Sequence, residues 1–275
     1  NGDIFTDLDI TDMVTFHREK GAKATIALSR VDNPCAFGVV ETDNDGRVRR
    51  FIEKPSPERV TTQWINAGIY ILEPGVLRLV PANSHYMFEK GLFPRLLELG
   101  EPVYGYHSSS YWLDMGTPDK YHSLNCDLLQ LKTRSALIKG IREGEIRCDR
   151  DVVIHPTAEI AGPVLIGSGC RIGEGVCIKG PVVMGQNCYV AGGASLEEAV
   201  LWDNVKVGGG ASLKQCIVSS NARINGKERA INCIVIPDHV GVAQVDAPGR
   251  LATSDRVILR SGARGERPLV PLREE

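Results

Sequence analysis

The sequence has no long hydrophobic run and no excess of charge of either sign. No stretch approaches the roughly 20 consecutive apolar residues that a transmembrane helix requires. The 32 basic and 34 acidic residues are intermixed and leave a formal net charge of −2, which gives no basic surface for a nucleic-acid backbone or an anionic membrane. We therefore expect no nucleic-acid partner, no membrane partner and a cytoplasmic location.

The chain also lacks the cysteine patterns of metal and redox sites. None of its eight cysteines forms a CxxC pair or a His-Cys cluster at zinc-ligand spacing, so we expect reduced thiols, several of them in the core. It also lacks a first methionine and begins Asn1-Gly2-Asp3. With 43% apolar and 24% charged residues, its 275 residues are sufficient for one large globular domain or two ordinary ones.

From residue 4 to about 133 the apolar pattern alternates between helical and strand periods, which is typical of a mixed α/β fold. Asp9 or Thr11 can cap a helix that Gly21 ends, and Asn44-Asp45-Gly46 predicts a hairpin turn. The expected strands are 24–28, 37–41, 48–53, 65–72 and 111–113, and the expected helical segments are 76–80, 88–99 and 117–132.

Beyond a charged connector the chain becomes an internal repeat with a period of six. The apolar anchors are Ile154, Ile160, Ile166, Ile172, Ile178, Met184, Val190, Leu196, Leu201, Val207, Leu213, Val218 and Ile224. Small or β-branched residues stand two positions before most anchors and share their strand face. The pattern predicts a solenoid of short strands, three hexapeptides to a coil and roughly four coils long.

Glycines such as Gly167, Gly173, Gly185 and Gly208 follow the anchors, where we expect tight corners to need conformational freedom. The repeat resembles the left-handed parallel β-helix of hexapeptide-repeat proteins, and the left hand is implied by that resemblance alone. The expected division is an α/β domain over 1–133, a linker over 134–153, the β-helix over 154–240 and a cap or tail over 241–275.

Four short motifs in the first half carry side chains suited to chemistry. Asp3 beside Gly2 lets a large ligand approach a carboxylate, although a surface turn is the simpler explanation when the motif is taken alone. Glu53-Lys54-Pro55 offers an acceptor for sugar hydroxyls and a cation for a phosphate, or simply a salt bridge at a sheet edge.

The other two motifs are Asn66-Ala67-Gly68, inside an apolar strand, and Asp114 at a turn before a capped helix. Glycine and asparagine weaken a buried strand, so either a ligand comes close there or the strand has a bulge. Asp114 is either a turn former or, with Asp3, one of two carboxylates for a Mg²⁺ ion that keeps its other positions for water and phosphate oxygens.

Taken in order, these motifs resemble the sugar-nucleotide pyrophosphorylase family. The resemblance covers about residues 1 to 225. Within the family, the motifs are most similar to those of mannose-1-phosphate guanylyltransferases or their glucose-1-phosphate relatives that carry a C-terminal β-helix. It implies the C-terminal part of a Rossmann-like nucleotidyltransferase domain followed by a left-handed β-helix. The motifs that carry it are Asn1-Gly2-Asp3, Phe37-Gly38-Val39-Val40, Glu53-Lys54-Pro55, Asn66-Ala67-Gly68-Ile69-Tyr70 and Trp112-Leu113-Asp114-Met115-Gly116-Thr117-Pro118.

The resemblance implies transfer of a nucleotidyl group from a nucleoside triphosphate to a sugar 1-phosphate with release of pyrophosphate, with mannose 1-phosphate and GTP as the favoured pair. It implies that Asp3 and Asp114 hold the catalytic Mg²⁺ and that Lys54 contacts the sugar phosphate. The sugar pocket would be lined by Gly38, Glu53, Asn66 and Gly68. Alignment and charge neutralisation would do most of the work.

One part of the family pattern is missing. The family's first strand and its glycine-rich loop, with an Arg and a Lys for the triphosphate, should lie well upstream of Asp3. Gly167-Ser168-Gly169 and Gly173-Glu174-Gly175 do not have phosphate-loop spacing. We therefore expect an N-terminally incomplete sequence that is inactive by itself.

Two other interpretations of the repeat stay open. Many hexapeptide β-helices carry acyltransferases with a histidine base, and His155 and His239 flank this repeat. Alternatively the β-helix is a non-catalytic assembly or regulatory module, which is compatible with the first reading and predicts a homo-oligomer formed through the β-helix.

Overall fold

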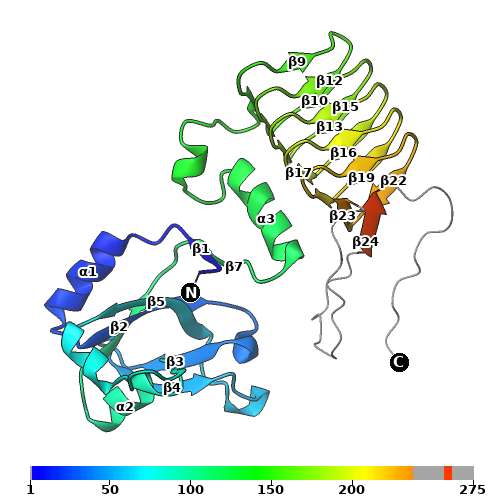
Figure 1. The fold of residues 1–275 in the computed structure, drawn as a ribbon. Coiled ribbons are helices and arrows are strands. Elements are labelled where there is room, and N and C mark those ends of the chain that lie inside the picture. The colour runs from blue at the N-terminus through cyan, green and yellow to red at the C-terminus, as the bar shows by residue number, and fades with distance from the viewer. Residues whose placement is uncertain (1, 238–256, 262–275) are drawn as a thin grey trace, which may run out of the picture. The chain divides into compact units, whose positions relative to one another are not determined.

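A computed structural model describes residues 2–237 and 257–261. The chain divides into two compact units between Asp114 and Met115. The first unit runs from blue to cyan-green in Figure 1, and the second begins with α3 and contains the solenoid.

The first unit is built on a five-stranded sheet with the order β4-β3-β5-β2-β6. β2 runs parallel to β6 and antiparallel to β5, while β3 is antiparallel to both β4 and β5. A separate antiparallel pair joins β1 to β7. The strands are β1 (Ile4–Thr6), β2 (Ala24–Arg30), β3 (Gly38–Thr42), β4 (Val48–Glu53), β5 (Trp64–Leu72), β6 (Val103–His107) and β7 (Trp112–Asp114).

Two helices cover opposite faces of β2, an inner strand that lies between β5 and β6. Ile26 and Leu28 share a buried cluster with Phe93 of α2 (Leu92–Glu98), whereas Ala27 belongs to a cluster with Met13 of α1 (Ile10–Glu19). This alternation is what a strand covered on both sides requires. Short 3₁₀ turns complete the unit: η1 (Pro34–Ala36), η2 (Pro57–Arg59) and η3 (Pro74–Leu79).

The expected mixed α/β fold of this half is confirmed. Asp9 caps α1 by accepting from the backbone N–H groups of Thr11 and Asp12. The structure adds β6, which the sequence analysis did not predict. In that strand a Cβ on Gly105 would collide with the side chain of Leu28. Glycine usually weakens a strand, but here it is needed for close packing against Leu28.

The second unit is a parallel β-solenoid, seen in Figure 1 as a stack of coils. Its three sheets contain strands β8 to β24. Strands β8 to β23 pair at intervals of 18 residues, as in Ile160↔Ile178, and later of 17, as in Leu196↔Leu213, whereas β24 pairs with β23 at an interval of 24, as in Cys233↔Val257. Two of the sheets have five strands each, so the solenoid has about five turns, and the expectation of roughly four coils was wrong. The extra turn begins at β8 (Ile146–Cys148), inside the predicted linker.

The strands of the solenoid are β8 (Ile146–Cys148), β9 (Val153–Ile154), β10 (Glu159–Ala161), β11 (Val164–Ile166), β12 (Arg171–Ile172), β13 (Cys177–Lys179), β14 (Val182–Met184), β15 (Tyr189–Val190), β16 (Ser195–Glu197), β17 (Val200–Leu201), β18 (Lys206–Val207), β19 (Ser212–Lys214), β20 (Ile217–Val218), β21 (Arg223–Ile224), β22 (Arg229–Ile231), β23 (Cys233–Pro237) and β24 (Val257–Ser261). Apart from β24, the predicted cap over 241–275 lies outside the described residues.

The six-residue period is confirmed by burial. All anchors from Ile166 to Ile224 are buried, together with most of the small residues that precede them. Ile154 and Ile160 are more exposed because they lie in the first coil, which has a neighbouring coil on one side only.

The glycines that follow the anchors are needed for a reason other than the predicted one. A Cβ on Gly167 would lie 2.7 Å from the backbone of Gly185, and a Cβ on Gly173 would lie 2.9 Å from the backbone N of Gly192. Close approach between successive coils therefore excludes a side chain at these positions. The left-handed backbone conformation occurs instead at corner residues such as Gly169 and Asn187.

Helix α3 (Pro118–Leu129) packs on the solenoid within the second unit. The imidazole Nε2 of His122 lies 2.6 Å from the carbonyl oxygen of Glu198, and Trp202 Nε1 donates to the Tyr121 hydroxyl at 3.2 Å. These contacts explain why the compact units divide before α3, whereas the sequence pattern suggested a boundary near 133. A 3₁₀ turn, η4 (Ala136–Ile138), follows α3.

Among the described residues, none of the helices combines the length and the apolar composition of a transmembrane segment.

Replacing Ile178 with alanine should lower the free energy of unfolding of the solenoid by about 2–5 kcal/mol, because a fully buried side chain leaves a cavity. Ile231, in the same sheet but 61% exposed, is the matched control and should change stability by less than about 0.5 kcal/mol. Urea denaturation followed by circular dichroism measures both; equal losses would contradict the assigned register.

Candidate functional site

Asp3 and Asp114 lie at the same end of the β1–β7 pair. Ile4 is paired with Asp114, and Asp3 is the residue just before Ile4. Asp3 is exposed in a bend, whereas Asp114 is partly buried as the last residue of β7. The strand pairing thus brings the backbones of Asp3 and Asp114 close together, although the two residues are 111 positions apart in the chain (114 − 3).

Gly38 and Glu53 are directly paired between β3 and β4. A Cβ on Gly38 would lie 2.8 Å from Oε2 of Glu53 and 2.8 Å from the ring of Phe51, so the glutamate carboxylate occupies the space above the glycine. Lys54 follows with a φ of 44°, in the left-handed region, and its N–H donates to the carbonyl of Phe37 at 3.0 Å. This backbone turns the chain away from the sheet directly after Glu53.

Asn66, Ala67 and Gly68 form a bulge in β5. Ile26 pairs with Tyr70 and Leu28 with Asn66, so residues 67–69 lie opposite Ala27 alone. Gly68 has a φ of 74°, and its N–H donates to Oδ1 of Asn66 at 2.9 Å. The bulge that we considered is confirmed, and within it the Asn66 amide is bonded to the backbone of Gly68.

Trp112 connects the bulge to the other motifs. Its Nε1 donates to the carbonyl of Ala67 at 2.9 Å, and its ring packs edge-on against Phe37, with centroids 5.4 Å apart. Phe37 directly precedes Gly38, and Asp114 is two residues beyond Trp112 on β7. One side chain therefore ties the Gly38, Asn66 and Asp114 segments together inside the first unit.

Glu89 is a polar residue of this region that the sequence analysis did not identify. Tyr70 donates from its hydroxyl to Oε1 of Glu89 at 2.8 Å and accepts from Nδ2 of Asn66 at 2.8 Å. Burial, together with the negative charge of Glu89, raises the pKa of Glu53, although Lys54 and Lys90 act in the opposite direction. The one signal in the sequence was an acidic residue after Phe88, in a segment otherwise predicted as helix.

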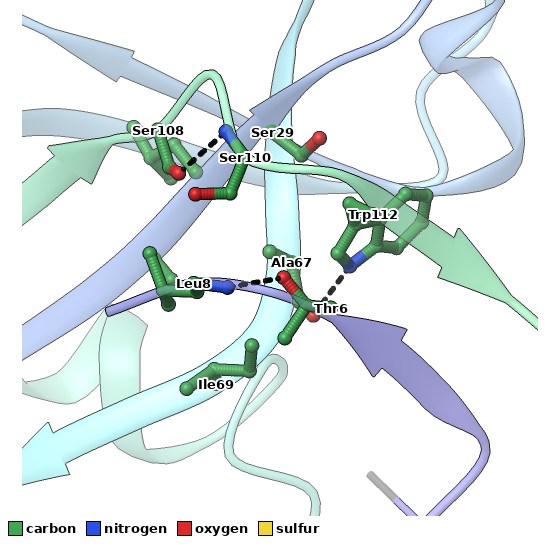
Figure 2. Close-up of a pocket in the computed structure, with 10 residues that line it drawn as sticks. Thr6, Leu8, Ser29, Ala67, Ile69, Ser108, Ser110 and Trp112 are labelled. Carbon is green, nitrogen blue, oxygen red and sulfur yellow. Dashed lines mark hydrogen bonds between the residues drawn. The ribbon is translucent and has the colours of Figure 1, made fainter. Parts of the chain in front are cut away.

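A hollow lies beside Trp112, and residues of β5, Ala67 and Ile69, form part of its lining. Figure 2 shows it bordered by Thr6, Ser29, Ser108 and Ser110, with the Trp112 to Ala67 hydrogen bond at its margin. The hollow contains hydroxyl groups and small apolar side chains but no acidic or basic lining residue.

The acyltransferase reading gains no support from His155. Its Nδ1 lies 2.8 Å from the Thr157 hydroxyl, a local contact two residues along the chain, and the residue is half-buried. His239 lies outside the described residues. Among residues 2–237 and 257–261 no group of three or more His, Cys, Asp or Glu side chains is arranged to hold a metal ion, so Asp3 and Asp114 would have to act as a pair.

Comparison with known proteins gives two family matches and a consistent set of relatives. Residues 1–131 match the nucleotidyl transferase family, and residues 142–246 match the GMPPB C-terminal domain. The chain is 38% identical over 176 residues to a mannose-1-phosphate guanylyltransferase of Mycobacterium tuberculosis, an alignment that covers 64% of this chain and 48% of the relative.

Two further relatives agree. A UTP–glucose-1-phosphate uridylyltransferase of Synechocystis is 35% identical over 209 residues, covering 74% of this chain and 53% of the relative. A mannose-1-phosphate guanylyltransferase catalytic subunit beta of Drosophila pseudoobscura pseudoobscura is 34% identical over 175 residues, covering 62% and 43%. The chain spans about half the length of these relatives. The chain thus carries a nucleotidyl transferase domain over residues 1–131, followed by a GMPPB C-terminal domain over residues 142–246.

Proposed function

We propose that the protein containing these residues is a sugar-1-phosphate nucleotidyltransferase. It joins a nucleoside monophosphate unit from a nucleoside triphosphate to a sugar 1-phosphate and releases pyrophosphate. The observation that carries the proposal is the convergence of the Gly38, Asn66 and Asp114 segments around Trp112, in a domain that matches this family.

The sugar side of the site would be formed by Gly38, Glu53, Asn66 and Gly68. Gly38 leaves room for the Glu53 carboxylate, which accepts hydrogen bonds from sugar hydroxyls. The bulge at Gly68 presents the Asn66 amide, which both donates and accepts. Lys54, which is exposed and itself has a left-handed backbone conformation, supplies the cation for the sugar phosphate.

Asp3 and Asp114 fit a Mg²⁺ ion in the chemistry of their donor atoms. Carboxylate oxygens are the ligands that Mg²⁺ prefers, and two of them leave coordination positions for water and phosphate oxygens. When bound, the ion would neutralise charge on the phosphate oxygens of the reacting triphosphate.

The reaction requires alignment more than covalent help from the protein. A phosphate oxygen of the sugar 1-phosphate attacks the α-phosphorus in line, and the bond from the α-phosphorus to the bridging oxygen breaks, which releases pyrophosphate. The task of Lys54 and the sugar-side groups is to hold the attacking oxygen in place, which is an entropic contribution. No side chain has to form a covalent intermediate.

Mannose 1-phosphate and GTP are the substrates we propose, because several relatives carry the name mannose-1-phosphate guanylyltransferase. Glucose 1-phosphate and UTP are the alternative that another relative's name suggests. A panel of the two sugar phosphates against GTP and UTP, with pyrophosphate release as the readout, separates the two. A cytoplasmic location stays a prediction from the sequence.

In the full-length protein, Asp114→Asn should lower Mg²⁺-dependent pyrophosphate release by at least about 100-fold, because one carboxylate ligand and its charge are lost. Asp3→Asn should have a similar effect. Asp45→Asn, at a hairpin turn where the carboxylate contacts Lys20, is the control and should leave the rate unchanged. Full activity in both Asp3→Asn and Asp114→Asn would contradict the assigned metal pair.

Gly38→Ala should raise the KM for the sugar 1-phosphate at least about tenfold while leaving the KM for the triphosphate unchanged, since the new methyl group displaces the Glu53 carboxylate. Gly75→Ala is the matched control, because nothing lies within 4 Å of a Cβ there and its φ is not positive. Steady-state kinetics with each substrate varied in turn tests this; parallel changes in both KM values would point to general misfolding instead.

We also propose that the protein is a homo-oligomer through its β-helix. β8, β9 and β10 are the end strands of the three solenoid sheets, so each has an open backbone edge in the described structure. Apolar side chains are exposed beside these edges, Val153 by 54% and Ile146 by 42%. An end with both features suits stacking against the same coil of a second copy.

Sedimentation velocity tests the proposed interface. Val153→Lys should convert the oligomer to a smaller species, because a charge would be buried without a partner. Tyr189→Lys, at an exposed position in β15, the middle strand of a solenoid sheet, should not alter the sedimentation coefficient. A monomeric wild-type chain, or an unchanged Val153→Lys variant, would contradict this interface.

A further inference from the structure

A continuous chain of hydrogen bonds crosses the sugar side of the site. It runs from the Gly68 N–H to Oδ1 of Asn66, from Nδ2 of Asn66 to the hydroxyl of Tyr70, and from that hydroxyl to Oε1 of Glu89. The three distances are 2.9, 2.8 and 2.8 Å. Each lies within the range of a well-formed hydrogen bond.

The chemistry of the groups fixes the direction of this chain. An ionised carboxylate accepts and cannot donate, so the Tyr70 hydroxyl must give its proton to Glu89. The hydroxyl then faces Asn66 with a lone pair, and only the NH₂ side of the amide can satisfy it. The Gly68 N–H donates a hydrogen bond to the oxygen of the same Asn66 amide, which fixes the amide in the same orientation.

Both ends of the chain are held rigidly. The Tyr70 ring packs against Phe93 with centroids 4.9 Å apart and against Phe88 at 6.3 Å, and Phe88 directly precedes Glu89. At the other end Gly68 is held in the bulge, whose Ala67 carbonyl is bonded by Trp112. The amide of Asn66 therefore keeps one N–H and one oxygen lone pair in a defined direction.

We propose that Glu89 is a positioning residue for sugar recognition, acting through Tyr70 to hold the Asn66 amide in the orientation that meets a sugar hydroxyl. The inference rests on the function proposed above, because it assumes that Asn66 contacts the sugar. Glu89 itself need not touch the substrate. Without it the tyrosine hydroxyl is free to donate to Asn66, and only the Gly68 N–H still opposes a flip of the amide.

Glu89 has a second effect, through charge, on Glu53. Burial raises the pKa of Glu53, the negative charge of Glu89 raises it further, and Lys54 and Lys90 lower it. Glu53 must be ionised to accept from a sugar hydroxyl with both oxygens. Sugar binding is therefore lost, as the pH falls, at a higher pH than for an ordinary glutamate, and removing the charge of Glu89 moves that loss to lower pH.

Three substitutions in the full-length protein separate these effects. Glu89→Ala and Tyr70→Phe should each raise the KM for the sugar 1-phosphate about five- to tenfold, with the KM for the triphosphate unchanged. Glu89→Gln keeps an acceptor for Tyr70 and should restore most of the affinity at neutral pH. As the pH falls, the Glu89→Gln variant should lose its affinity for the sugar 1-phosphate at a lower pH than the wild type. Titration of the substrate's own phosphate affects both proteins alike, so it does not contribute to the difference.

Glu98→Ala is the matched control, since Glu98 is an exposed carboxylate at the end of α2 that contacts Arg95. A second readout does not depend on activity. In the 275-residue chain, the side-chain NH₂ resonances of Asn66 in a ¹⁵N spectrum should shift or broaden in Glu89→Ala and stay near their wild-type positions in Glu89→Gln and Glu98→Ala.

The outcomes are distinguishable. An active wild type whose Glu89→Ala and Tyr70→Phe variants keep a normal KM for the sugar phosphate would overturn the positioning role. So would unchanged Asn66 resonances in Glu89→Ala, whether or not the enzyme turns over. A wild-type protein that releases no pyrophosphate with any sugar 1-phosphate would instead overturn the proposed function, and the Asn66 resonances would still decide the role of Glu89.

Discussion

The hydrogen bond from the Trp112 indole to the Ala67 carbonyl is the contact on which the site depends. These residues are 45 positions apart, and the bond joins β7 to the bulge of β5. The carbonyl is available because the bulge interrupts the ladder with β2. The edge-on contact with Phe37 then brings the start of β3, and with it Gly38, to the same place.

The bulge accounts for residues that look unfavourable in isolation. Asn66 and Gly68 weaken a buried strand, but together they close a local hydrogen bond within the bulge. Stability lost in the strand is offset by the Tyr70–Glu89 pair and the aromatic cluster around it. The same arrangement places the Glu89 carboxylate near enough to Glu53 to raise the pKa of Glu53. Such repulsion between like charges is typical of functional sites.

The solenoid obeys a simpler constraint, because each coil must repeat the backbone of the one beneath it. That requirement selects a small set of residues at each position, and it explains why apolar anchors at six-residue spacing were sufficient to predict the architecture. It also explains the error over Gly167 and Gly173. The sequence pattern cannot tell a glycine needed for a turn from one needed for contact between coils, since the colliding backbone belongs to a different coil.

The linear sequence was enough to determine the mixed α/β half, the six-residue repeat and the order of the motifs, because these depend on local periodicity and on residue types a few positions apart. The tertiary structure decided how those motifs meet. It paired Ile4 with Asp114, placed Glu53 over Gly38 and brought Glu89 to Tyr70. Glu89 could not be singled out beforehand, because its partner Tyr70 is 19 positions away. Its proposed role depends on the hydrogen bond that it accepts from Tyr70, and no pattern in the sequence predicts that bond.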